Sequence, residues 1–120
     1  MKTTGFASPA TEYETQRISF DHLLRRHPSS TFEFRYQGTD LLEYGIFEND
    51  ILIIDRAAPI KDGCMAIISS DGSFICRKLL YSSKWKCFVY KEGSRWFRVA
   101  EAFGTVTYCI HSLTPHDIPR

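Results

Sequence analysis

The chain has 120 residues, of which 43% are hydrophobic and 14% aromatic, and its formal net charge at pH 7 is +1. This composition is typical of one globular domain, and no apolar run approaches the roughly 20 residues that a transmembrane helix needs. The opening stretch, MKTTGFASPATEYETQ, is too polar for a signal peptide, so we expect a cytoplasmic protein that does not associate with membranes.

The first predicted elements are an extended arm and one short helix. Residues 1–16 contain mostly small and polar residues, which is typical of an arm that is ordered only where it lies on another surface. In ISFDHLLRRHPSS, which follows, Ile18, Leu23 and Leu24 form a short apolar stripe. Ser19 or Asp21 can cap the start of a helix there, and we expect Pro28 to end it.

From residue 31 the pattern changes to that of β-strands. TFEFRY alternates apolar and polar residues, DILIID is a β-branched run, and CMAIISS, SFICRKLLY, KWKCFVY, RWFRVAEAF and FGTVTYCIHSL complete a series of about seven strands. The pair Asp71-Gly72 predicts a tight hairpin turn, and the stretch from Lys91 to Ser94 predicts a second one. We therefore predict a mainly β, compact antiparallel domain over residues 17–113, with one or two short helices and a flexible tail at 114–120.

The aromatic residues of the second hairpin allow two interpretations. They are Trp85, Phe88, Tyr90, Trp96 and Phe97. They could form a binding platform, but the sequence favours cross-strand packing within one hairpin, because aromatic pairs of this kind commonly stabilise sheets.

Neither a metal site nor direct DNA binding is predicted. The four cysteines are Cys64, Cys76, Cys87 and Cys109. They form no C-x-x-C pair and are expected to be small buried hydrophobic residues. His111 shares a predicted strand face with Cys109, but two possible ligands are too few for a zinc site. No Lys/Arg cluster exceeds the pair Arg25-Arg26, so we predict no cofactor and no direct contact with DNA.

Five segments in order resemble the LexA/UmuD family, and within it the processed form of the UmuD proteins. They are GFASPATEY, QRISFDHLLRRHPSSTF, GTDLLEYGIFENDILIID, DGSFICRKL and AFGTVTYCIHSL, and together they run from Gly5 to about Leu113. The resemblance implies the β-rich fold of the family's C-terminal peptidase domain. In that family a serine attacks a peptide bond of the chain's own N-terminal arm, and a neutral lysine takes the serine's proton.

The residues that match the family's catalytic pair are Asp40 at the serine position and Arg77 at the lysine position. A carboxylate has no hydroxyl to serve as the nucleophile, and an arginine stays protonated and cannot act as a base. We therefore expect no catalytic residues, a pseudo-peptidase, and an ion pair between Asp40 and Arg77, which a guanidinium can make bidentate. The alternative is that both side chains extend into solvent in an open cleft.

Two neighbouring residues are weak substitutes for the missing pair. Thr39 precedes Asp40 and Lys78 follows Arg77. Successive side chains on a strand point to opposite faces, so we expect Lys78 to point away from Arg77. An active self-cleaving peptidase that uses Thr39 and Lys78 is therefore disfavoured.

The same resemblance implies a function and binding partners for the chain. The family's cleavage site would fall at Thr4 and Gly5, where only four residues precede the glycine, so a vestigial site is expected. The resemblance implies a homodimer that binds a UmuC-like Y-family DNA polymerase during translesion synthesis and mutagenesis in the SOS response to DNA damage, with a RecA-type filament as a further partner. The alternative is a regulatory decoy that forms mixed dimers with an active UmuD- or LexA-type protein.

Overall fold

The computed structural model describes residues 19–114, and the expected arm and most of the expected tail lie outside this range. Its elements, in chain order, are the helix α2 (Phe20–Leu24), the 3₁₀ turn η1 (Pro28–Ser30), β1 (Thr31–Arg35), the 3₁₀ turn η2 (Leu42–Tyr44), β2 (Ile51–Asp55), β3 (Met65–Ser70), β4 (Ser73–Lys78), β5 (Leu80–Ser82), β6 (Cys87–Glu92), β7 (Arg95–Arg98) and β8 (Ala102–Ile110). The predicted mainly β, antiparallel fold class is confirmed.

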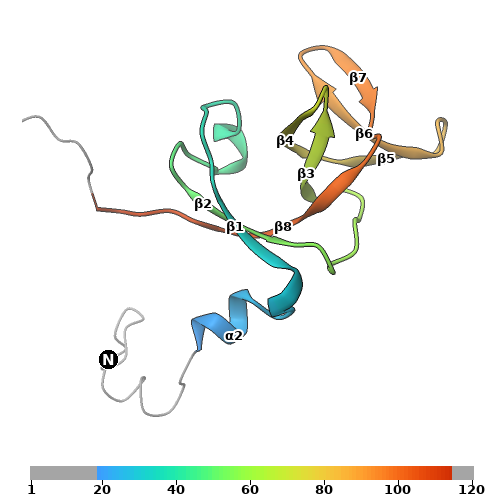
Figure 1. Ribbon diagram of the computed structural model, residues 1–120. Coiled ribbons are helices and arrows are strands. Elements are labelled where there is room, and N and C mark those ends of the chain that lie inside the picture. Colours follow the sequence, from blue (N-terminus) through green and yellow to red (C-terminus); the bar gives the residue numbers. More distant parts are fainter. Residues whose placement is uncertain (1–18, 115–120) are drawn as a thin grey trace, which may run out of the picture.

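The strands form two antiparallel sheets (Figure 1). Sheet A has five strands in the order β1-β2-β8-β3-β4, and sheet B has three in the order β5-β6-β7. The predicted turn at Asp71-Gly72 joins β3 to β4, and both of its residues have positive φ angles. The second predicted hairpin joins β6 to β7, where Glu92 pairs with Arg95.

Two buried clusters on opposite faces of β3 hold the sheets and loops together. Ile67 belongs to a cluster in which Leu41 and Ile46 anchor the segment around η2. Its neighbours along the strand, Ala66 and Ile68, belong to a second cluster that includes Tyr90 of β6. Because side chains alternate along a strand, β3 positions the η2 segment on one face and sheet B on the other.

The stretch predicted as one strand, SFICRKLLY, is two strands in different sheets. Leu79 separates them: its N–H donates to the Cys64 carbonyl at 2.8 Å, and its carbonyl accepts from the Gly63 N–H at 2.7 Å. These bonds to the β2–β3 loop, together with full burial of the Leu79 side chain, end β4 and send β5 into sheet B. The stretch RWFRVAEAF is likewise divided between β7 and β8.

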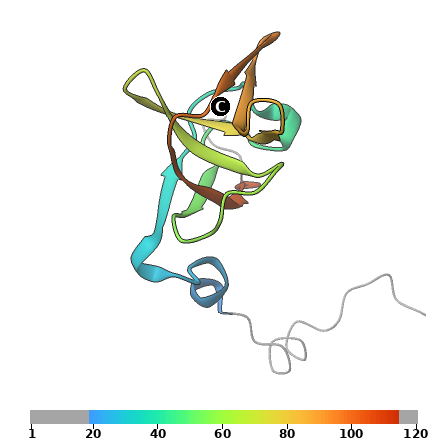
Figure 2. The same ribbon diagram turned by 90° about the vertical axis from the view of Figure 1, so that its right-hand side faces the viewer.

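The short helix forms where predicted but ends before Pro28. Ser19 caps it by accepting the His22 N–H at 3.2 Å. Arg25, with φ −121° and ψ 62°, already leaves the helical conformation, and Pro28 instead begins η1. The helix buries no residue, and Figures 1 and 2 show it apart from the two sheets.

Within residues 19–114, no helix is long and apolar enough to cross a membrane.

All four cysteines are free. Cys76 is buried as predicted, and burial raises the pKa of its thiol to about 12. Cys64 and Cys87 are only half-buried, and the expectation of a buried residue is wrong for Cys109, which is exposed. The Cys109 thiol donates a hydrogen bond to the Asp50 carboxylate at 3.2 Å.

Candidate functional site

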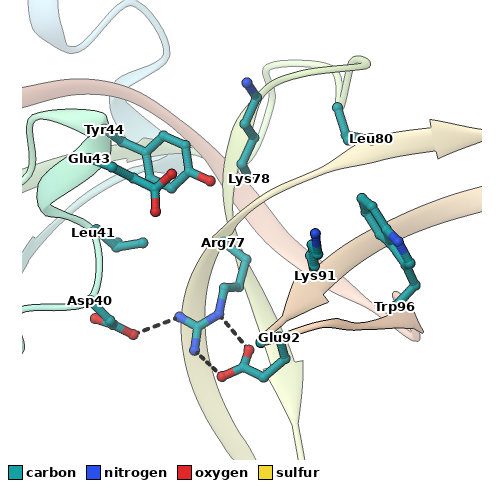
Figure 3. A pocket seen from close by; sticks show the side chains of 11 residues that line it. Asp40, Leu41, Glu43, Tyr44, Arg77, Lys78, Leu80, Lys91, Glu92 and Trp96 are labelled. Carbon is teal, nitrogen blue, oxygen red and sulfur yellow. Dashed lines mark hydrogen bonds and ion pairs between the residues drawn. The ribbon is translucent and has the colours of Figure 1, made fainter.

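A cleft of about 550 Å³ lies between the η2 segment and sheet B (Figure 3). Asp40, Glu43 and Tyr44 line one side of it, Arg77 and Lys78 come from the end of β4, and Lys91, Glu92 and Trp96 come from the β6–β7 hairpin. The cleft thus contains both residues at the family's dyad positions.

Two neighbouring residues determine the position of the Asp40 side chain: the buried Leu41 on its C-terminal side and Gly38 on its N-terminal side. Leu41, the next residue, is only 2% exposed and packs in the first buried cluster. Gly38 has φ 143°, and a Cβ there would come within 3.1 Å of the Tyr36 hydroxyl oxygen and 3.2 Å of an Asp40 carboxylate oxygen. The absence of a side chain at Gly38 therefore lets the Tyr36 hydroxyl donate to Asp40.

Asp40 and Arg77 form the predicted ion pair. Arg77 Nη1 lies 3.3 Å from Asp40 Oδ2, with the Arg77 side chain 16% exposed and that of Asp40 56% exposed. The alternative in which both side chains extend freely into solvent therefore does not describe this cleft. The contact is single rather than bidentate.

Glu92 is the bidentate partner of Arg77, and it was not among the residues predicted for the site. Arg77 Nε and Nη2 donate to the two Glu92 carboxylate oxygens at 2.8 and 2.9 Å, and Nη1 also donates to the Cys76 carbonyl at 2.8 Å. The hydrogen bond with Glu92 raises the pKa of Arg77 further, and the same bond lowers the pKa of Glu92. No motif could have indicated this pair, because it depends on how sheet B sits against β4.

The two weak substitutes lie apart from this network. Thr39 is exposed in the bend before Asp40 and does not line the cleft. Lys78 lines the cleft, but its Nζ lies 5.9 Å from the Tyr44 ring centroid, and Figure 3 shows it pointing away from the Arg77 guanidinium. The expected divergence of Lys78 and Arg77 is therefore observed.

Arg77 forms ion pairs with two carboxylates, that of Asp40 at the other position that matches the family's dyad and that of Glu92 beside it. One guanidinium holds two carboxylates from different parts of the fold, and its own proton is more tightly held than usual. Among the described residues, no group of three His, Cys, Asp or Glu side chains is placed to hold a metal ion.

Outside the cleft, two buried aspartates at the ends of β2 pair with histidines. Asp50 Oδ1 lies 2.6 Å from His111 Nδ1, and Asp55 Oδ2 lies 2.6 Å from His27 Nδ1. Burial alone would raise the pKa of both aspartates. The hydrogen bonds from Phe47 N–H, His111 and Cys109 lower the pKa of Asp50, and those from His27, Ala57 N–H and Ser30 lower that of Asp55.

Comparison with known proteins identifies the family to which the chain belongs. The sequence pattern of the family described as Peptidase S24-like matches residues 1–88. Protein ImpA of Salmonella typhimurium is 31% identical over 112 residues, which cover 89% of this chain and 77% of ImpA. Protein MucA of Escherichia coli is 31% identical over 78 residues, 65% of this chain and 53% of MucA. Protein SamA of Salmonella typhimurium is 26% identical over 115 residues, 94% of this chain and 82% of SamA.

The family match covers well over half of the chain and includes both dyad positions, 40 and 77. This relationship supports a UmuD-like role in the SOS response. The chain therefore belongs to the S24-like peptidases of the LexA/UmuD family.

Proposed function

We propose that this protein is a non-cleaving UmuD-like subunit that dimerises in the cytoplasm and assists a UmuC-like Y-family DNA polymerase in translesion synthesis. The observation that carries the proposal is the Arg77 guanidinium, which replaces the family's lysine base and is held by Glu92 and Asp40. An arginine in this setting cannot accept a proton from a nucleophile, and Asp40 offers no hydroxyl. The ion pairs of Arg77 with Asp40 and Glu92 instead stabilise the contact between sheet B and the η2 segment.

An open strand edge supports dimer formation. Residues 105–110 of β8 pair with β2 on one side, whereas β3 pairs only with residues 102–105 on the other. The unpaired edge carries exposed Tyr108 and Ile110, and exposed Leu113 follows it. An unpaired edge with apolar side chains favours pairing with another chain. The same edge would permit mixed dimers with a UmuD- or LexA-type protein.

Cleavage is tested by incubating the full chain with a peptide that spans a LexA/UmuD-type cleavage site. We expect no fragment from the wild type, and a measurable fragment from the double variant Asp40→Ser/Arg77→Lys, which restores the hydroxyl and a base that can lose its proton. The single variant Asp40→Ser is the matched control and should stay inactive. Wild-type cleavage that is lost in Thr39→Ala or Lys78→Ala would overturn the proposal.

Polymerase binding is tested separately. The full chain should co-purify with a UmuC-like polymerase expressed with it, and binding should persist in Asp40→Ser/Arg77→Lys if assembly does not depend on the cleft. Failure to retain any such polymerase would remove the assembly part of the proposal and leave the cleavage result untouched.

A further inference from the structure

One face of sheet B, which borders the cleft at Lys91 and Trp96, carries Trp85 and Trp96 together with Lys84, Lys91 and Arg98, and we call it the tryptophan face. Residues paired across an antiparallel sheet share a face. Trp96 pairs with Lys91, and Arg98 pairs with Val89, which in turn pairs with Leu80. Trp85 and Lys84 lie in the turn between β5 and β6 on the same side, where both line one groove with Val89 and Trp96.

The groove has a volume of about 330 Å³ and is lined by Leu80, Tyr81, Ser82, Lys84, Trp85, Val89 and Trp96. No acidic residue is part of this lining. Trp85 and Trp96 remain 38% and 43% exposed, so part of each side chain is accessible to a ligand. The expected packing of aromatics across the hairpin applies to Tyr90 and Phe97, whose rings stack at 5.6 Å on the opposite, inner face, but not to the two tryptophans.

Each tryptophan ring has a cation beside it. The Arg98 guanidinium lies 5.1 Å from the Trp85 ring centroid, and Lys91 Nζ lies 5.7 Å from that of Trp96. Figure 3 shows Lys91 and Trp96 side by side on the hairpin. Flat apolar surfaces are thus interleaved with positive charges along one face.

The charge of the surrounding segment is strongly positive although that of the whole chain is nearly zero. Residues 77–98 contain seven lysines and arginines and one acidic residue, a net charge of +6, against +1 for the chain. The acidic residue, Glu92, lies on the inner face and is neutralised by Arg77. No sequence motif marks this concentration of charge, because the cations are dispersed among neutral residues and come together only when three strands pair.

We propose that the tryptophan face binds single-stranded nucleic acid, with bases stacked on Trp85 and Trp96 and phosphates next to Lys84, Lys91 and Arg98. Aromatic side chains that receive unpaired bases, within a positive groove that follows the backbone, are the features by which proteins hold single strands without reading their sequence. Duplex DNA does not expose its base faces, and an acidic peptide would use the cations but not the rings. The inference goes beyond the proposed function and revises the expectation of no direct contact with DNA.

The experiment uses the chain's own fluorescence, because the only two tryptophans both lie on this face. We titrate the purified full chain with an unlabelled oligothymidylate of about 12 nucleotides and follow tryptophan emission. Stacking should quench the emission. The logarithm of the binding constant should fall with the logarithm of salt concentration with a slope of about −2, as expected when a single strand gives up the counterions of three phosphates.

Variants separate stacking from charge. Trp96→Ala should weaken binding about five- to a hundredfold, as measured by the anisotropy of a labelled oligothymidylate. Lys91→Ala/Arg98→Ala should weaken binding and make the salt slope shallower. Lys61→Ala, which removes an exposed cation from the β2–β3 loop, is the matched control and should bind as the wild type does.

Thermal unfolding of each variant confirms that it is folded, and Trp96→Phe, which keeps a stacking ring, should retain most of the affinity. The proposal is overturned if oligothymidylate leaves tryptophan emission unchanged at low salt. It is also overturned if polyglutamate or duplex DNA of equal charge binds as tightly as the single strand, since charge alone would then account for binding.

Discussion

Arg77 is the residue on which the changed cleft depends. A lysine at this position could lose its proton, whereas an arginine can hold two carboxylates at once through a planar, permanently charged group. Its guanidinium forms ion pairs with both Asp40 of the η2 segment and Glu92 of sheet B. The substitution at position 77 therefore changes both the chemistry of the cleft and the connection between two parts of the fold.

The distances predict unequal coupling of Arg77 to its two partners. In a double-mutant cycle, the Arg77–Glu92 coupling energy should be about 1 kcal/mol and the Arg77–Asp40 coupling less than about 0.5 kcal/mol. The reason is that the Glu92 contact has two short hydrogen bonds and the Asp40 contact only one longer contact, while both carboxylates are about half exposed and screened by solvent.

The measurement is the free energy of unfolding from denaturant titration of Arg77→Ala, Glu92→Ala, Asp40→Ala and the two double variants. Raising the salt concentration to 1 M should reduce both coupling energies, because salt screens the partly exposed charges. An Arg77→Ala variant as stable as the wild type would show that the ion pairs do not hold the cleft together. An Asp40 coupling as large as that of Glu92 would contradict the predicted order.

At the scale of elements, β2 is fixed at both ends by buried carboxylates. Asp50 precedes the strand and Asp55 is its last residue, and both are nearly inaccessible to solvent. Each accepts a backbone N–H from the adjoining turn and pairs with a histidine from another segment. Strand β2, which lies between β1 and β8 in sheet A, is thereby tied to the chain before β1 and to the chain after β8.

This arrangement predicts a specific loss of stability in acid. The pKa of Asp50 is lower in the folded chain than in the unfolded chain, so the unfolded state binds more protons at low pH. The stabilising contribution is complete above about pH 5 and is lost as the pH falls below about 4. Asp50→Asn should therefore cost about 1.5–3 kcal/mol of unfolding free energy at pH 7, and less at pH 3.

Denaturant unfolding of Asp50→Asn between pH 7 and pH 3 tests this expectation. Asp71→Asn makes the same chemical change in an exposed turn and should follow the wild type at every pH. If the difference between Asp50→Asn and the wild type stayed constant across this range, the Asp50 carboxylate would not be the source of the acid sensitivity.

Local signals were sufficient for the turns and for most of the strands, but not for the points at which two predicted strands divide or for the contacts between sheets. The turn at Asp71-Gly72 and the period-two pattern of TFEFRY depend on neighbouring residues, and both predicted the correct strands. The Arg77–Glu92 pair and the tryptophan face depend instead on which strands lie next to one another in the folded chain. The division of SFICRKLLY at Leu79 follows from bonds to residues 63 and 64, which no local pattern encodes. The Asp40–Arg77 contact could be predicted only because a family resemblance supplied the geometry.

For the whole molecule, the open edge of β8 is the surface on which assembly depends. Its residues 106–110 have a hydrogen-bonded neighbour in β2 and none in β3, and Figure 1 shows β8 passing beyond β3 toward the end of the described chain. The tryptophan face belongs to sheet B and lies on other strands. A dimer formed along β8 would therefore leave the tryptophan face of each copy free for a further ligand.

The last prediction is that charge placed on this edge converts a dimer into a monomer. Tyr108→Arg should raise the dimer dissociation constant at least tenfold in sedimentation equilibrium, because two like charges would face each other where apolar side chains would otherwise pack. Phe20→Arg places the same charge on the exposed helix α2, away from the sheets, and should leave the dissociation constant unchanged. Thermal unfolding at low concentration checks that Tyr108→Arg still folds as a monomer. If Tyr108→Arg associated as tightly as the wild type while Phe20→Arg dissociated, the dimer interface would lie at the helix and not along β8.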